Sequence, residues 1–261
     1  MHTFRYRLRV ALLFALPIIL ISARATAAED TARSPSKQNT VEEDFTEDTD
    51  TFKVYDPWEP MNRGIFKFND RVYFWVFKPI AKGYRAAVPE GGRVAISNFF
   101  SNLVSPIRIV NAALQLKGEK LGNELTRFGL NSTIGLLGFF DVAQKDFRIP
   151  KSNEDFGQTL GYYGVPSGPY IVLPFLGPSS LRDGTGLFVD GKYLDPAAKN
   201  SLIFPNELDT TSEYLAEKFV VIETDISLDK DTYEAIVQES LDPYLFLRNA
   251  YIQRRNGLIK K

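Results

Sequence analysis

The sequence predicts a predominantly α-helical domain that carries one glycine- and proline-rich, hairpin-like loop region. Helix-capping residues followed by apolar side chains at helical spacing recur along most of the chain from Asp56 onward. Helix-breaking residues instead gather in residues 156–188, which hold seven glycines and four prolines. The chain has 261 residues, 44% of them hydrophobic, so it can bury one sizeable core.

The first helix is predicted to open at Asp56-Pro57-Trp58-Glu59, where Asp56 can cap it and Glu59 completes a capping-box-like pair. Its apolar face is unusually broad, because six successive apolar residues run from Val72 to Phe77. Pro79 is expected to end or kink it.

Further helices are predicted over residues 92–103, from Ser105-Pro106 onward, and over residues 119–127. Residues 131–143 are apolar and rich in glycine, which permits close helix packing or backbone kinks. Residues 156–188 contain too many helix breakers for a regular helix. Within them, residues 169–175 are expected to be extended, with residues 162–165 as their pairing partner.

Three helices are predicted in the last part of the chain. One covers residues 210–223 and opens with a Thr210/Glu213 capping pattern, and the next covers residues 233–240. The last opens at Asp242-Pro243 and is expected to end near Gly257.

The N-terminus has the features of a secretory signal peptide over residues 1–27. A basic stretch precedes an apolar run, and Ala25-Thr26-Ala27 provides a small-x-small cleavage site. The apolar run is short for a membrane span, which makes an uncleaved anchor the less favoured alternative. Residues 28–53 are expected to be an acidic flexible leader, residues 54–257 the helical domain, and residues 258–261 a basic tail.

The composition excludes several kinds of chemistry. The chain contains no cysteine, and its single histidine, His2, lies in the predicted signal peptide. Catalysis by His or Cys, haem, iron–sulfur clusters and His/Cys zinc sites are therefore excluded from the mature chain, and we expect no cofactor and no metal. Basic and acidic side chains are nearly balanced from Thr51 onward, so no nucleic-acid partner is expected.

Two groups of residues are candidates for function. Arg182-Asp183 lies in the glycine-rich segment, where the arginine could contact a phosphate or the two could form a structural ion pair. The broad aromatic face could pack in a core, or it could meet lipid or a partner. The residues expected at a membrane interface or against acyl chains are Phe66, Phe68, Tyr73, Trp75, Phe77, Phe139 and Phe140.

An ordered set of motifs resembles one known family, MlaA (also called VacJ), whose members maintain outer-membrane lipid asymmetry. The motifs cover about residues 55–255 and include Asp56-Pro57-Trp58-Glu59-Pro60-Met61-Asn62-Arg63, Asn131-Ser132-Thr133-Ile134-Gly135, Phe156-Gly157-Gln158-Thr159-Leu160-Gly161-Tyr162-Tyr163-Gly164-Val165, Leu181-Arg182-Asp183 and Asp242-Pro243-Tyr244. Each motif is weak alone, but their order is specific.

The resemblance implies a ring-like arrangement of amphipathic helices around a central channel, in the periplasmic leaflet of the outer membrane. It implies that phospholipid mislocalised to the outer leaflet passes to a periplasmic, MlaC-like carrier that feeds an inner-membrane ABC transporter, and that a trimeric porin is a partner. No bond is made or broken, so no enzyme activity is expected. The family's hairpin-like loop would fall on residues 156–175, with Gly161, Gly164 and Gly168 as flexible points.

Many family members are lipoproteins, whereas this chain has no cysteine to lipidate. Its attachment to the membrane is therefore expected to depend on the folded surface and on partners. Two alternatives remain: a porin-binding periplasmic adaptor without lipid passage, and a carboxylate-based glycan hydrolase using Glu154 and Asp155, or Asp183 and Asp190.

Overall fold

The computed structural model describes residues 54–198, 200–202, 211–229 and 231–260. The chain divides into two units, Met1–Phe52 and Lys53–Lys261, and only the second is described here. The predicted signal peptide and the acidic leader lie outside the described residues. The helices are α2 (Glu59–Val72), α3 (Lys78–Ala87), α4 (Glu90–Leu103), α5 (Ser105–Leu114), α6 (Gly118–Thr133), α7 (Val142–Lys145), α8 (Phe156–Tyr162), α9 (Leu181–Val189), α10 (Thr211–Leu228), α11 (Thr232–Glu239) and α12 (Pro243–Lys260).

Two π-helical turns and one short hairpin complete the described part. The turns are η1 (Tyr73–Phe77) and η2 (Asp190–Leu194), and the hairpin pairs β1 (Tyr170–Leu173) with β2 (Gly177–Ser180). The all-α prediction is confirmed, since this hairpin is the only sheet among the described residues. None of the described helices is both long and apolar enough to cross a membrane.

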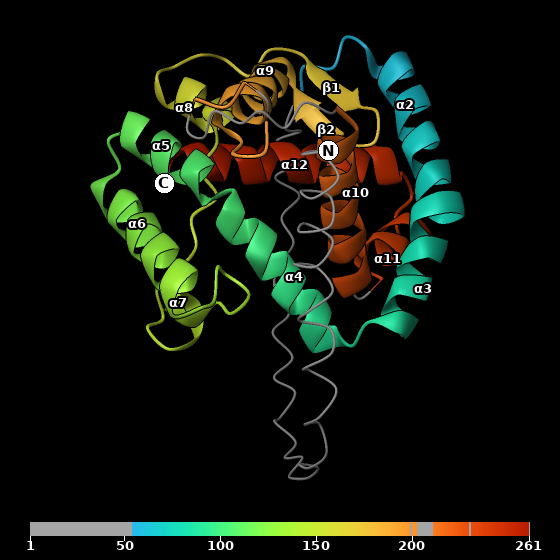
Figure 1. The fold of residues 1–261 in the computed structure, drawn as a ribbon. Coiled ribbons are helices and arrows are strands. Elements are labelled where there is room, and N and C mark those ends of the chain that lie inside the picture. Colours follow the sequence, from blue (N-terminus) through green and yellow to red (C-terminus); the bar gives the residue numbers. More distant parts are fainter. Residues whose placement is uncertain (1–53, 199, 203–210, 230, 261) are drawn as a thin grey trace, which may run out of the picture. The chain divides into compact units, whose positions relative to one another are not determined.

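The first helix differs from its prediction at both ends. Asp56 does not cap α2, whose N-cap is Trp58, because the Asp56 carboxylate instead accepts hydrogen bonds from Asn62 and from Tyr244 and Arg248 of α12. Pro79 does not end the helix either. The π-helical turn η1 precedes it and α3 continues through it, so α2, η1 and α3 follow one another along one edge of Figure 1.

The prediction that residues 156–188 contain no regular helix is wrong. Both α8 and α9 lie in this segment, and their glycines serve helix packing. A Cβ atom on Gly186 of α9 would lie 2.2 Å from the backbone nitrogen of Gly157 on α8, so the two backbones meet where neither has a side chain. The predicted strand partner is also wrong, because β1 pairs antiparallel with residues 177–180 and not with residues 162–165.

The C-terminal helices follow the sequence more closely. Asp242 caps α12 as expected and accepts a hydrogen bond from the Leu245 nitrogen at 3.1 Å. The helix does not end near Gly257 but continues to Lys260. The predicted cap Thr210 lies outside the described residues.

Two asparagines of α2 attach this helix to the hairpin. Asn62 is fully buried; its amide donates to the Tyr170 oxygen at 3.0 Å and accepts from the Val172 nitrogen at 2.9 Å. Two helical turns later, Asn69 makes the equivalent pair of bonds with the backbone of Leu173 and Phe175. Asn62 therefore completes the backbone hydrogen bonding of the β1 edge, and Asn69 pairs with the end of β1 and with the turn that follows it.

The packing contacts run in a closed circuit. From α2 they pass to β1, β2, α12, α8, α5, α4, α10 and α3, and α3 is continuous with α2 through η1. A closed circuit is what the predicted ring-like order of helices requires. The central channel stays a prediction.

Candidate functional site

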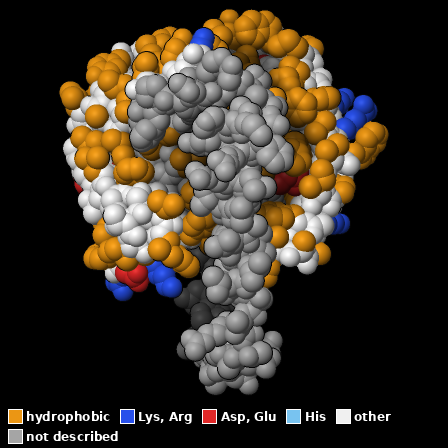
Figure 2. Space-filling view, in the orientation of Figure 1, with side chains coloured by type: hydrophobic (Ala, Val, Ile, Leu, Met, Phe, Trp, Pro, Cys, Tyr) orange, Lys and Arg blue, Asp and Glu red, His pale blue; other side chains and the backbone are white. Residues whose placement is uncertain are grey.

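Polar and apolar residues are distributed in the opposite way to that of a typical water-soluble domain. Among the described residues, the buried set contains more than twice as many polar or charged residues as hydrophobic ones. Many large hydrophobic side chains are exposed, and they cover much of the face seen in Figure 2. Large exposed apolar areas mark contact with membranes or partners.

The loop between α6 and α7 shows how the backbone contributes to this exposure. Leu136 and Leu137 both adopt left-handed backbone conformations, with φ of 51° and 61°. Such conformations are unfavourable for residues other than glycine. The loop nevertheless holds both leucine side chains outward, with 62% and 61% of their surface exposed.

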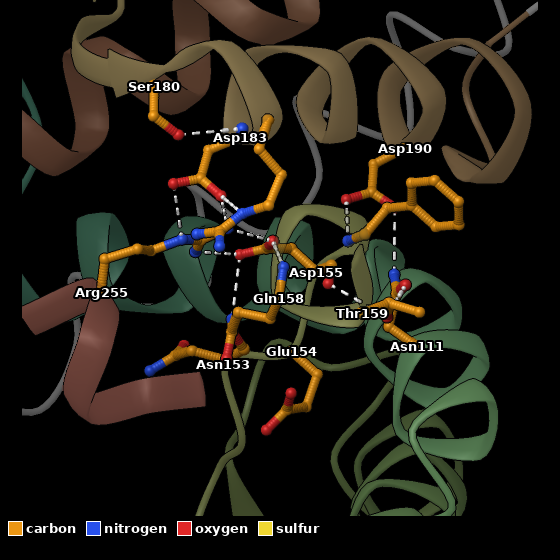
Figure 3. Close-up of polar contacts among 12 residues, drawn as sticks. Asn111, Asn153, Glu154, Asp155, Gln158, Thr159, Ser180, Asp183, Asp190 and Arg255 are labelled. Carbon is orange, nitrogen blue, oxygen red and sulfur yellow. Dashed lines mark hydrogen bonds and ion pairs between the residues drawn. The ribbon is translucent and has the colours of Figure 1, made fainter. Parts of the chain in front are cut away.

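A mostly buried polar network joins α8, α9 and α12 (Figure 3). Arg255 of α12 donates to Asp183 of α9 at 3.1 Å and also pairs with Asp155, the N-cap of α8. Asp183 additionally accepts from the Arg182 Nε atom at 3.0 Å and from the Tyr251 hydroxyl at 2.6 Å. Burial would raise the pKa of Asp183, but these donors lower it below its ordinary value.

A cavity of about 170 Å³ adjoins this network and is lined by Asp155, Ser179, Asp183, Leu187, Asp190, Tyr251 and Arg255. At its edge, Asp190 accepts hydrogen bonds from the Phe156 nitrogen at 2.8 Å and from the Asn111 amide at 3.0 Å. Burial raises the pKa of Asp190 to about 6. Pockets for drug-sized ligands are typically about 300–1,000 Å³, so this cavity is too small for a phospholipid.

A second polar cluster lies between α4, α5, α6 and α7. Arg108 pairs with Glu124 at 2.7 Å and both are buried, while Arg127 pairs with Asp141 at 2.7 Å. A cavity of about 10 Å³, which suits a single water molecule, is lined by Arg108, Arg127 and Asp141 of these two ion pairs. The interior of this part of the chain is therefore built from paired charges rather than from a hydrophobic core.

The predicted site residues fall into different environments. Arg182 and Asp183 do form an ion pair with each other, and only 8% and 7% of their surfaces are exposed. Gly161 lies inside α8, where an added Cβ atom would come within 2.7 Å of Ile259 and 2.9 Å of Arg182. Gly164 and Gly168 lie between α8 and β1 with φ of 84° and 69°. The observed hairpin spans residues 170–180, so the predicted loop of residues 156–175 covers only its first strand.

The predicted membrane-contact residues divide into two groups. Trp75, Phe68 and Phe140 are exposed, with 78%, 44% and 54% of their surface accessible. The others pack against neighbouring side chains: Phe66 against Tyr244, Tyr73 and Phe77 against Tyr233 and Phe219, and Phe139 in a stack on Phe99.

The family model described as MlaA lipoprotein matches residues 54–257 of this chain. The chain belongs to the MlaA family. The intermembrane phospholipid transport system lipoprotein MlaA of Escherichia coli is 35% identical over 205 residues, which cover 77% of each chain, and its counterpart in Haemophilus influenzae is 31% identical over 76% of each. An uncharacterized protein of Rickettsia prowazekii is 32% identical over 80% of this chain and 79% of its own length.

A solved structure confirms the relationship in three dimensions. This structure, reported as "Structural basis for maintenance of bacterial outer membrane lipid asymmetry", matches with a TM-score of 0.65 at 34% identity. The match covers 78% of this chain and 98% of that chain. The MlaA resemblance inferred from the ordered motifs is thus confirmed.

Sequence reasoning missed the roles of Asp56, Asn111 and Arg255. Each pairs with residues far along the chain; Arg255, for example, lies 72 positions from Asp183. No local pattern marks such partners.

Proposed function

We propose that this MlaA-family chain transports phospholipid between membranes in association with the outer membrane. The observation that carries the proposal is the inverted distribution of side chains, with charged pairs buried and large apolar residues exposed. The family, and the names of the relatives in Escherichia coli and Haemophilus influenzae, support the same function.

This distribution of buried charged and exposed apolar side chains suits the transport of a phospholipid, which has both apolar and polar parts. Transfer of an acyl chain into water costs about 0.8 kcal/mol per CH₂ group, and transfer of the polar headgroup into an apolar interior is also unfavourable. Exposed residues such as Trp75, Leu137 and Phe140 offer contact to acyl chains, and the polar interior offers contact to headgroups. Because the chain contains no cysteine, its attachment would depend on this apolar surface and on partners.

The finer assignment follows the family resemblance. The chain would remove mislocalised phospholipid from the outer leaflet and pass it to an MlaC-like periplasmic carrier that feeds an inner-membrane ABC transporter. A trimeric porin would be its partner in the outer membrane. Gly164 and Gly168, with their positive φ values, would let the segment before β1 change conformation.

The test is mass-spectrometric quantification of phospholipid retained by the full chain after gentle extraction from outer membranes. An unrelated outer-membrane protein serves as the control. Phospholipid above the control level is the expected result. Co-purification with a porin and with no excess phospholipid would contradict lipid transport and favour the adaptor function.

Arg182 provides a residue-level test of headgroup passage. Its Nη2 atom is buried without a hydrogen-bond partner among the described residues, so it could donate to a phosphate oxygen that approached it. Arg182→Ala should reduce lipid transfer between vesicles, whereas Arg254→Ala, on the exposed side of α12, should not. Arg182→Lys keeps the charge beside Asp183 and controls for folding. Normal transfer by a stably folded Arg182→Ala protein would remove Arg182 from the mechanism.

A further inference from the structure

The cavity of about 170 Å³ beside Arg255 has three carboxylates and one guanidinium in its lining. The Nη1 and Nη2 atoms of Arg255 donate to Asp155 and Asp183, and its Nε atom lies 3.0 Å from an Asp183 oxygen. Asp183 also pairs with Arg182 at 3.0 Å. These two acidic and two basic side chains therefore balance one another's charge.

The third carboxylate, Asp190, has only uncharged hydrogen-bond partners among the described residues. One of its oxygens accepts from the Asn111 amide at 3.0 Å and the other from the Phe156 nitrogen at 2.8 Å. No dashed line joins Asp190 to Arg255 in Figure 3. Arg255 acts on the Asp190 charge at longer range, but Asp155 acts on it more strongly and with the opposite sign. The cavity therefore has one uncompensated negative charge, on a side chain that is almost completely buried.

The unused hydrogen-bonding capacity of this cavity consists of acceptors. A carboxylate has about four lone-pair sites, so about two of those on Asp190 are free. The Tyr251 hydroxyl donates its proton to Asp183, and the Ser179 hydroxyl donates to the Ser180 carbonyl oxygen at 3.3 Å. Neither hydroxyl has a second proton to donate. An occupant of the cavity therefore has to donate hydrogen bonds, and the charge of Asp190 favours a cation.

The size of the cavity limits the occupant to a small group. A cavity of about 150 Å³ can hold benzene, so this one has room for about six non-hydrogen atoms. Leu187 of its lining is 48% exposed, so a small group can reach the cavity from the surface. A hard metal ion prefers about six or more oxygen ligands, whereas Asp190 is the only carboxylate of the lining without a basic partner. A small organic cation fits these conditions better.

We propose that this cavity binds a primary ammonium group, with Asp190 as the counterion. A primary ammonium has three N–H donors and no acceptor, which matches the free acceptors of Asp190, Tyr251 and Ser179. The ammonium can belong to the ethanolamine headgroup of a phospholipid, whose acyl chains would stay outside the cavity, or to a soluble amine. The headgroup source rests on the proposed function, whereas the ammonium site itself does not.

The first experiment measures the Tm of the full chain in detergent at neutral pH, with ethanolamine hydrochloride or an equal concentration of sodium chloride. A ligand that binds only the folded chain raises the Tm. For a domain of about 200 residues the expected rise is about 1–2 °C when the ligand concentration equals the dissociation constant. Ethylene glycol, which is of similar size but uncharged, should cause no rise. No rise with ethanolamine, or an equal rise with ethylene glycol, would overturn the ammonium site.

Two variants locate the binding in this cavity. Asp190→Asn removes the counterion and should abolish the rise in Tm caused by ethanolamine. Leu187→Trp reduces the space in the cavity without changing any charge, so it should also abolish the rise even if Asp190→Asn does not fold. Leu181→Trp is the matched control, since Leu181 is similarly exposed on the same helix but does not line the cavity. A wild-type rise in the folded Leu187→Trp protein would contradict the proposal.

A second experiment distinguishes the two sources of the ammonium. The full chain is extracted from vesicles that contain equal parts of phosphatidylethanolamine and phosphatidylglycerol, and mass spectrometry gives the ratio of the two lipids retained. If the source is a headgroup, Leu187→Trp should lower the share of phosphatidylethanolamine about threefold relative to Leu181→Trp, the effect of losing one partly exposed ion pair. An unchanged ratio, together with the ethanolamine effect on Tm, would assign the site to soluble amines. Wild type that retains no lipid would contradict the transport function but not the ammonium site.

Discussion

The contact between α8 and α9 gives the sharpest prediction about stability. A Cβ atom on Gly186 would lie 2.2 Å from the Gly157 nitrogen and 2.6 Å from the Gly157 Cα atom. Ordinary contacts of a Cβ atom are 3.4–4 Å, so Gly186→Ala requires the two helices to move apart by about 1 Å. Backbone atoms cannot avoid the clash by rotating, as a side chain could.

The expected change in the free energy of unfolding is the difference between two opposing effects of Gly186→Ala. Overpacking destabilises by up to about 3 kcal/mol, whereas the higher helix propensity of alanine stabilises by about 1 kcal/mol. Gly186→Ala should therefore lower the free energy of unfolding by about 2 kcal/mol. For a domain of about 200 residues this corresponds to a fall in Tm of about 4–8 °C.

Gly184→Ala is the matched control on the same helix. An added Cβ atom there would meet Ile171 at 3.4 Å and Ser179 at 3.7 Å, both ordinary contacts. The helix-propensity gain of about 1 kcal/mol should then raise the Tm. Circular dichroism of both variants in the same detergent measures the difference. Equal Tm values for the two variants would refute the close backbone contact between α8 and α9.

The remaining predictions concern buried polar groups. Because burial raises the pKa of Asp190 to about 6, the folded state binds its proton more tightly than the unfolded state, and stability should fall as pH rises from about 4 to 6. Asp190→Asn should flatten this part of the stability profile, and a profile as steep as that of wild type would contradict the assignment. Asn62→Ala should cost about 2–4 kcal/mol in denaturant unfolding, since it leaves two buried backbone groups of β1 unpaired. Asn69→Ala makes the same change at a half-buried position and should cost less; the reverse order would be inconsistent with the burial of Asn62.

Local sequence signals were enough to predict most of the helices. The starts at Ser105-Pro106 and Asp242-Pro243 were found because proline suits the first turn of a helix and, at the second start, Asp242 also caps α12. The broad apolar face at residues 72–77 was also visible, as was the absence of cysteine from the chain. The order of weak motifs was enough to identify the MlaA family, since chance rarely preserves such an order.

Tertiary structure decided what the local signals could not. Residues 156–188 contain enough helix breakers to predict a loop, yet two helices form there because Gly157 and Gly186 allow their backbones to pack together. Asp56 had the sequence context of a helix cap but bonds to α12, where Tyr244 and Arg248 provide buried partners. The sequence alone determined which side chains were available, and folding determined their partners, because a buried charge pairs with whichever group the packing of distant helices brings within reach.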